Sequence, residues 1–175
     1  ISFEVFSDDI DEMKIQALKI SKLGKNVNVK IPITNSKGFS TSKLIADLTK
    51  KGVLVNVTAI FTLDQIQDVI KNIRFTDKII LSIFAGRIAD TGRDPEEMII
   101  KSKKILKKYK NAKILWASTR ELFNIIQAQR CGCNIITVPD NLLKKIDIFG
   151  KNLNEYSRET VKMFYDDAIK SGYKI

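Results

Sequence analysis

Lys30 is the residue of this sequence best placed to do chemistry. It lies in Val27-Asn28-Val29-Lys30-Ile31-Pro32, where polar and apolar side chains alternate as on a half-buried strand. Glu4, Asn56 and Ser82 stand near the ends of three other apolar runs, and positions 4, 30, 56 and 82 are each 26 residues apart. That interval fits one strand and one helix, which would give the four polar side chains equivalent places in successive units. Lys30 could then serve as a reactive amine.

The alternative is a lysine without a catalytic role, which either reaches solvent from a sheet edge or balances the charge of a carboxylate. Lysine in a central apolar strand is rarely buried without a role, so the functional interpretation is preferred.

Alternating strands and helices would position these side chains. The predicted strands are Phe3–Phe6, Val27–Ile31, Val53–Val57, Ile79–Ile83, Ile114–Trp116 and Ile135–Val138. Asp8 and Asp9 precede the first helix, Gly24 follows it, and Asp94-Pro95-Glu96-Glu97 starts a long lysine-rich one.

Six βα units in succession imply a parallel sheet, either open and doubly wound or part of a closed barrel that lacks two units. No Gly-rich phosphate loop follows the first strand, which counts against a dinucleotide-binding fold. Polar residues at several strand ends favour class α/β and a (β/α)₈ TIM barrel, whose active sites gather at that face. Residues 1–175, 44% of them hydrophobic, can bury one substantial core, and we predict a single barrel domain.

The net charge of +10 comes mostly from lysines spread along the chain. In the densest run, Lys101 to Lys113, apolar residues recur at helical spacing, so an amphipathic surface helix explains it. Basic residues interleaved with stacking aromatics are not apparent, and we predict no nucleic-acid partner. No apolar stretch reaches the roughly 18 residues of a membrane span, and we predict no membrane segment.

Cys131 and Cys133 are the only cysteines, and there is no histidine. They cannot form an ordinary four-ligand zinc site within this chain, so no metal is predicted. Two buried free thiols are expected instead, in a reducing, cytoplasmic compartment.

Several strand ends resemble those of the transaldolase family, including its small bacterial members and the related fructose-6-phosphate aldolases. The matching segments are Val29-Lys30-Ile31-Pro32-Ile33-Thr34, Val55-Asn56-Val57-Thr58-Ala59-Ile60-Phe61, Leu81-Ser82-Ile83-Phe84-Ala85-Gly86-Arg87-Ile88 and Trp116-Ala117-Ser118-Thr119-Arg120. Their order along nearly the whole chain makes the joint match specific.

The resemblance implies a metal-independent class I aldolase barrel, without a cofactor, in which Lys30 forms a Schiff base with a ketose phosphate. The amine must be neutral to attack, so burial or nearby positive charge should disfavour its ammonium form. Glu4 would hold a water used in proton transfer, and Thr58 would share it. Asn56 would orient the substrate's hydroxyls, and Ser82 would hold its dihydroxyacetone end. For Asn56 and Thr58 the alternative is polar filling of an inward-facing barrel layer.

Arg87, Ser118 and Arg120 would bind the substrate's phosphate, because guanidinium groups pair with phosphate oxygens through two hydrogen bonds. Solvated arginines after strands are common, so the resemblance carries this prediction. Aldolase-type members have glutamine where this chain has Glu4 and tyrosine where it has Phe84. Both positions therefore favour transfer over simple cleavage.

Family members begin with a strand bearing an acid–base aspartate and a second strand with a Thr-Asn-Pro type motif, and neither appears in this sequence. We therefore expect the N-terminal units, roughly 40 to 60 residues, to be missing from the sequence shown. The stretch 156–172 resembles the family's C-terminal helix, which implies a homo-oligomer, either a pentamer or a decamer.

The leading hypothesis is a transaldolase of the pentose phosphate pathway that moves a dihydroxyacetone unit between sugar phosphates. One alternative is an aldolase that releases dihydroxyacetone or a relative acting on a polysaccharide sugar. The other is a noncatalytic barrel that binds sugar phosphates.

Overall fold

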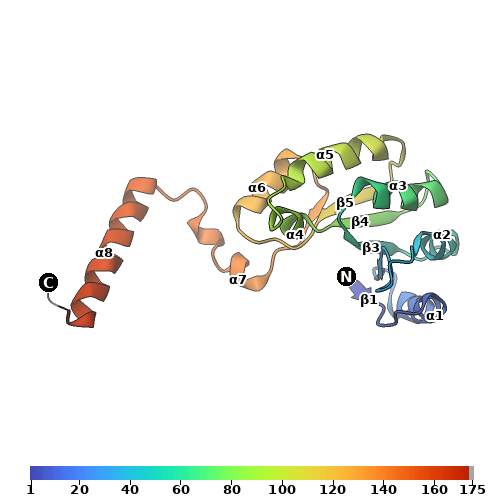
Figure 1. Ribbon diagram of the computed structural model, residues 1–175, viewed down its shortest axis with the longest axis horizontal. Helices are drawn as coiled ribbons and strands as arrows, with labels where there is room; N and C mark the ends of the chain where they lie inside the picture. The colour runs from blue at the N-terminus through green and yellow to red at the C-terminus, as the bar shows by residue number, and fades with distance from the viewer. Residues whose placement is uncertain (174–175) are drawn as a thin grey trace. The chain divides into compact units, whose positions relative to one another are not determined.

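The computed structural model describes residues 1–173 (Figure 1). The chain forms two compact units, Ile1–Pro139 and Asp140–Ile175. Each is described by itself below, and the single barrel domain over 1–175 stays a prediction.

The first unit is built on a six-stranded parallel sheet with the strand order β1-β2-β3-β4-β5-β6. The strands are β1 (Ser2–Glu4), β2 (Asn28–Pro32), β3 (Val55–Ile60), β4 (Ile79–Ile83), β5 (Ala112–Trp116) and β6 (Ile135–Ile136). Chain order and spatial order coincide, as in consecutive units of a (β/α)₈ barrel, whereas a doubly wound sheet reverses direction at a switch point. The predicted fold class is confirmed.

A helix follows each of the first five strands. The helices of the first unit are α1 (Ile10–Ile20), α2 (Ser42–Lys50), α3 (Leu63–Asn72), α4 (Ala85–Ala89), α5 (Pro95–Ile105) and α6 (Phe123–Arg130), with short 3₁₀ turns at η1 (Ser21–Leu23) and η2 (Leu106–Lys108). In Figure 1, α1, α2, α3 and α5 follow one another in an arc along one face of the sheet. The opposite face is left for polar side chains.

The alternation of side chains along each strand creates this division. Residues that point toward the helices are fully or almost fully buried, and they include Val29, Ile31, Val55, Val57, Leu81, Ile83, Ile114 and Trp116. On β2 the residues that alternate with Val29 and Ile31, which include Asn28 and Lys30, point to the opposite face and are only partly buried. We call the face that carries Lys30 the inner face of the sheet.

Several strands begin or end elsewhere than predicted, because pairing defines a strand and the apolar run does not. Phe6 leaves the sheet, and its backbone N–H donates to the Gln16 side chain at 2.7 Å. The N–H of Val53 donates to the carbonyl of Leu48 in the turn after α2, so β3 begins two residues later than predicted. The predicted bounds 79–83 of the fourth strand are confirmed.

The sequence predicted one amphipathic helix over the lysine-rich run, but the structure divides this run among a helix, a turn, a loop and a strand. Helix α5 ends at Ile105, and η2 continues only to Lys108. Lys110 lies in the following loop and Lys113 on β5. The start of α5 is as predicted, because the Asp94 side chain accepts a hydrogen bond from the N–H of Glu96.

A buried carboxylate ties α5 to α6. Glu96 is 8% exposed, and its oxygens accept hydrogen bonds from Arg130 Nε at 2.9 Å, from Gln127 Nε2 at 3.1 Å and from Arg130 Nη2. These hydrogen bonds, chiefly those from the guanidinium, hold the pKa of Glu96 below its ordinary value of 4.5. The pair therefore stabilises the folded chain only while Glu96 is ionised.

Gly86 marks the closest approach between the loops that follow β4 and β5. A Cβ atom at this position would lie 1.6 Å from the carbonyl oxygen of Ser118. Ser118 itself has a left-handed backbone, with φ 63°. Only a residue without a side chain allows the two loops to lie so close.

The second unit contains α7 (Asp140–Leu143), the 3₁₀ turn η3 (Ile146–Ile148) and α8 (Leu153–Ser171). The C-terminal helix was predicted over 156–172, but it starts earlier because the Asn152 side chain caps it by accepting from the N–H groups of Asn154 and Glu155. Gly172, in the left-handed conformation, ends it.

Among residues 1–173, no helix has the length and apolar character that crossing a bilayer requires.

Replacing Glu96 with glutamine should lower the thermal midpoint by roughly 2–6 °C near neutral pH, because Arg130 loses its charged partner. Since the pKa of Glu96 is lowered by folding, its contribution is present above pH 4.5 and is lost as the pH falls through the folded-state value. The difference in midpoint between the two proteins should therefore shrink below pH 4.5. Thermal denaturation followed by circular dichroism across this pH range measures this difference.

Glu97→Gln, which removes an exposed pair with Lys101, is the control and should change the thermal midpoint little. A pH-independent difference would contradict this account.

Gly86→Ala should destabilise the protein by about 1–3 kcal/mol, because the added methyl group meets backbone that cannot rotate away. Gly24→Ala is the matched control: Gly24 is extended, and its nearest neighbour would be a side-chain oxygen of Asn26 at 3.3 Å. Urea denaturation of both variants gives the comparison. Equal stabilities would show that the two loops separate freely.

Candidate active site

A pocket of about 490 Å³ opens on the inner face, toward the carboxyl ends of the strands. Its lining residues are Ser2, Lys30, Asn56, Ser82, Phe84, Arg87, Leu115, Ala117, Ser118 and Thr137. The structure thus brings together six of the nine predicted site residues from four consecutive βα units. Glu4, Thr58 and Arg120 are not among the lining residues.

The sheet register explains why the polar residues meet. Glu4 is paired with Lys30 and Lys30 with Asn56, so these three form one row across β1, β2 and β3. Ser82 breaks the row, because Asn56 is paired with Ile80. The prediction of four equivalent positions is therefore right for three residues and wrong for Ser82. The loops and helix between β3 and β4 are two residues shorter than the 26-residue spacing assumes.

The Lys30 amine contacts a carboxylate. Its Nζ lies 3.5 Å from Oε2 of Glu4, and 32% of the Lys30 side chain and 47% of the Glu4 side chain are exposed. The burial or positive neighbour expected around the amine is thus not seen in the described part of the chain. Instead, the amine forms an ion pair with the Glu4 carboxylate, which is the arrangement that the alternative interpretation of Lys30 predicted.

Asn56 is held on both sides. Ser82 Oγ donates to Asn56 Oδ1 at 2.7 Å, and Asn56 Nδ2 donates to Ser2 Oγ at 3.1 Å. Asn56 and Ser82 are buried, with exposures of 2% and 1%. Each of the two partners takes one end of the amide, so two hydrogen bonds hold its plane in the pocket.

Thr58 lies two residues beyond Asn56 on the same inner face of β3, in register with Pro32. It is buried, and its hydroxyl has no hydrogen-bond partner among residues 1–173. A buried hydroxyl normally has such a partner, so Thr58 has an unused hydrogen-bonding group beside Asn56. The next residue, Ala59, has φ 58° and belongs to an irregularity in the pairing of β3 with β4.

Phe84 and Arg87 form one wall of the pocket. The guanidinium of Arg87 lies over the Phe84 ring, 5.4 Å from its centre. Phe61 packs on the same ring, with the two ring centres 5.7 Å apart. Arg87 has no carboxylate partner among the ion pairs of the described residues, which leaves its guanidinium available to an anion.

Arg120 is placed differently from the prediction. Its Nη2 donates to Asp90 Oδ2 at 2.5 Å, and each side chain of this pair is half exposed. The sequence pattern did not reveal that Asp90 would be the partner, since residues 30 positions apart meet only in the folded chain. A role for Arg120 in phosphate binding stays a prediction.

Ser2 and Thr137 line the pocket but were not predicted. Ser2 could have been found by alternation, because it precedes Glu4 by two residues and so shares its face of β1. Thr137 directly follows β6, and it gave the same signal as the other polar residues at strand ends. Its N–H donates to the carbonyl of Trp116 at 3.1 Å, which carries the β5–β6 pairing one residue further.

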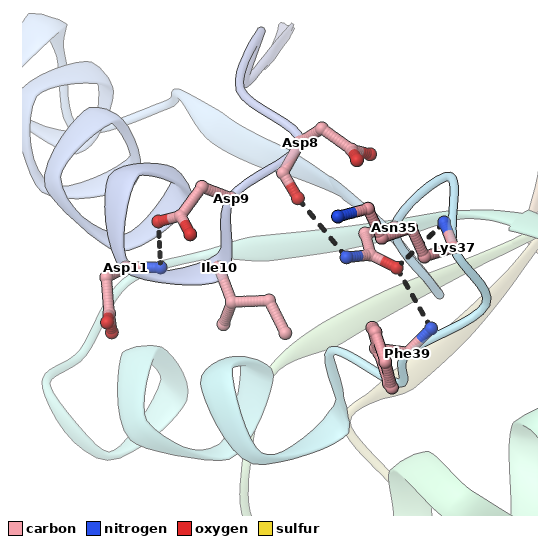
Figure 2. Close-up of a pocket in the computed structure, with 7 residues that line it drawn as sticks. All are labelled: Asp8, Asp9, Ile10, Asp11, Asn35, Lys37 and Phe39. Carbon is pink, nitrogen blue, oxygen red and sulfur yellow. Dashed lines mark hydrogen bonds between the residues drawn. The ribbon is translucent and has the colours of Figure 1, made fainter.

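Figure 2 shows a second pocket of about 410 Å³, where the loops after β1 and β2 meet; it is lined by Asp8, Asp9, Ile10, Asp11, Asn35, Lys37 and Phe39. Its polar groups serve the loops themselves. Asn35 Oδ1 accepts from the N–H groups of Lys37 and Phe39, and Asp9 caps α1. Ser36 donates to the Asp8 carboxylate and lowers its pKa. The hydrogen bonds from Asn35 and Ser36 to Asp8 join the two loops around this pocket. No predicted site residue lines it.

The described residues contain no cluster of three or more His, Cys, Asp or Glu that could hold a metal ion. Cys131 and Cys133 are free, with their sulfur atoms 3.9 Å apart. Cys131 is buried as predicted, whereas Cys133 is only partly so. Burial raises the pKa of both thiols. Neither lines the Lys30 pocket.

Comparison with known proteins shows the family to which the chain belongs. Residues 1–175 match the family model described as "Transaldolase/Fructose-6-phosphate aldolase". A "Probable transaldolase" of Thermoanaerobacter sp. (strain X514) is 31% identical over 176 residues, which cover 100% of this chain and 76% of the relative. One from Streptococcus agalactiae serotype V is 35% identical over 171 residues, with 97% and 75% covered. One from Nitrosopumilus maritimus is 32% identical over 148 residues, with 83% and 63% covered. The chain therefore belongs to the transaldolase/fructose-6-phosphate aldolase family.

Proposed function

We propose that this protein is a transaldolase of the pentose phosphate pathway, and that Lys30 carries a dihydroxyacetone unit from a ketose phosphate to an aldose phosphate as a Schiff base. The observation that carries the proposal is the pocket itself, which brings the Lys30 side chain together with the Asn56 amide, held at both ends, and with the Arg87 guanidinium, which has no carboxylate partner among the described ion pairs. Its similarity to proteins described as probable transaldolases supports the same reaction.

The reaction begins when the Lys30 nitrogen attacks the C2 carbonyl of fructose 6-phosphate. Loss of water gives an iminium ion. When a base removes the proton of the C4 hydroxyl, the C3–C4 bond breaks and its electron pair is accepted by the positive nitrogen. Glyceraldehyde 3-phosphate leaves, and a three-carbon enamine stays on the lysine. The enamine then attacks the aldehyde of erythrose 4-phosphate, and hydrolysis of the new iminium releases sedoheptulose 7-phosphate.

Glu4 is the carboxylate available for the proton transfers, which include removal of the amine proton and addition of a proton to the leaving water. A water held by Glu4 would also take the C4 hydroxyl proton and return it to the new hydroxyl when the enamine adds to the acceptor aldehyde. Thr58, with its unpartnered hydroxyl, would share a water with Glu4. Asn56 would orient the substrate's hydroxyls, and Ser82 would bind the dihydroxyacetone end.

The phosphate would lie beside Arg87 and Ser118, which line the pocket at the ends of β4 and β5. For Arg120 to join them, its guanidinium must exchange Asp90 for the phosphate.

Transfer is favoured over release of dihydroxyacetone by the phenyl ring of Phe84. A tyrosine here could donate a proton to the enamine carbon, whereas phenylalanine cannot. The enamine is then left for an aldehyde acceptor.

Helix α8 supports the predicted homo-oligomer. Phe164, Tyr165 and Ile169 follow Val161 by three, four and eight positions, so these four large apolar residues share one side of α8. We expect this stripe to pack on another copy of the chain.

Borohydride reduction in the presence of fructose 6-phosphate should trap the three-carbon unit on Lys30, as located by peptide mass spectrometry. Lys30→Met should abolish the adduct and lower transferase activity by roughly 10³-fold or more, as removal of a covalent nucleophile does. Lys113→Met is the matched control, because Lys113 also lies on the sheet but lines a different pocket near the amino ends of the strands. It should still form the adduct.

Absence of an adduct in the folded wild-type protein would reject the proposal. If fructose 6-phosphate nevertheless raised the thermal midpoint, the protein would be a sugar-phosphate binding barrel.

Phe84→Tyr should raise the ratio of dihydroxyacetone release to transfer by about tenfold or more, because the phenol supplies a proton to the enamine. Release is measured with fructose 6-phosphate alone, and transfer with erythrose 4-phosphate added. Phe61→Tyr, which alters the neighbouring ring outside the pocket lining, is the control. Substantial release by the wild type without an acceptor would instead favour an aldolase.

A further inference from the structure

The hydrogen bond from Asn56 to Ser2 joins two strands that are not neighbours. Ser2 lies on β1 and Asn56 on β3, with β2 between them. Neighbouring strands are about 4.8 Å apart, so β1 and β3 would be separated by about 10 Å in a flat sheet. A bond of 3.1 Å between two short side chains requires the inner face to be concave at this point. The bond thus spans the strand that carries Lys30.

This bond holds one end of the Asn56 amide, and the bond from Ser82 holds the other. An asparagine amide has two N–H donors and one oxygen, and rotation by half a turn exchanges them. Ser82 takes one lone pair of the oxygen, and Ser2 takes one N–H. The other N–H and the remaining lone pair stay available to a ligand, because Asn56 lines the pocket.

Ser82 alone does not determine the amide's direction, because a hydroxyl can donate to the oxygen or accept from the nitrogen. The hydroxyl of Ser2 has the same two possibilities, so the two contacts together hold the plane and the position of the amide, with one serine at each end. Asn56 is 2% exposed, so few other groups can replace a lost partner.

We propose that Ser2 is a positioning residue that holds the Asn56 amide in place beside Lys30, to which Asn56 is paired on the neighbouring strand. The proposal rests on the proposed function for the substrate's identity, but the contact between Ser2 and Asn56 stands without it. Ser2 acts through Asn56, and its own hydroxyl proton remains free to donate into the pocket.

Ser2→Ala should lower kcat/KM for fructose 6-phosphate by about five- to tenfold, the usual effect of one lost hydrogen bond. Lys30 should still be trapped by borohydride, and the thermal midpoint should stay close to that of the wild type. Ser2→Thr keeps the hydroxyl and should restore activity to within about threefold. Asn28→Ala, at the position paired with Ser2 on β2, removes an inner-face amide outside the Lys30 pocket and should leave activity unchanged.

A double-mutant cycle separates positioning from a general effect on the strand. If Ser2 acts through Asn56, Ser2→Ala should change kcat/KM by less than about twofold in the Asn56→Ala background. A loss of the same size in both backgrounds would overturn the proposal.

The side-chain amide signals of Asn56 in ¹⁵N–¹H spectra of the full-length protein supply a readout that needs no activity. They should move in Ser2→Ala and return in Ser2→Thr, and unchanged signals in Ser2→Ala would also overturn the proposal. If the wild type formed no adduct on Lys30, the proposed function would fail, while these signals would still decide whether Ser2 positions Asn56.

Discussion

The parallel register of β1, β2 and β3 is the constraint on which the rest of the site depends. Side chains alternate along each strand, so one register assigns a whole set of residues to the helices and the other set to the inner face. In this register Val29 and Ile31 are buried against the helices, and Lys30 meets Glu4 at 3.5 Å. A slip by one residue would exchange the faces, with charged groups buried in the core and the apolar residues exposed.

The curvature of the sheet adds what register alone does not supply. Ser2 and Asn56 belong to strands separated by β2, and they contact each other only because the inner face is concave. The same concavity forms the pocket, since a flat sheet would leave Lys30 and Ser118 on an open surface. Helices packed along the other face, visible as an arc in Figure 1, accompany this curvature.

Loop contacts position the groups that lie beyond the strands. Gly86 lets the loop after β4 approach the backbone of Ser118, so that Arg87 and Ser118 line the same pocket. Arg120 lies two residues after Ser118 in the loop that follows β5, and its guanidinium donates a hydrogen bond to Asp90. The proposed phosphate site at this end would therefore use one guanidinium without a carboxylate partner among the described residues, that of Arg87, and one that must first leave a carboxylate, that of Arg120.

The sequence by itself determined the order of strands and helices, the apolar face of each strand and the helix starts at Asp9 and Asp94, because alternation and capping depend on residues close together in the chain. It also identified most of the pocket, since polar residues near the ends of parallel strands must meet at one edge of the sheet. Only the tertiary structure decided that Ser82 lies outside the row of Glu4, Lys30 and Asn56, that Ser2 reaches Asn56, and that Asp90 binds Arg120. These contacts depend on loop lengths, sheet curvature and side-chain directions, which join residues far apart in the sequence and leave no local pattern.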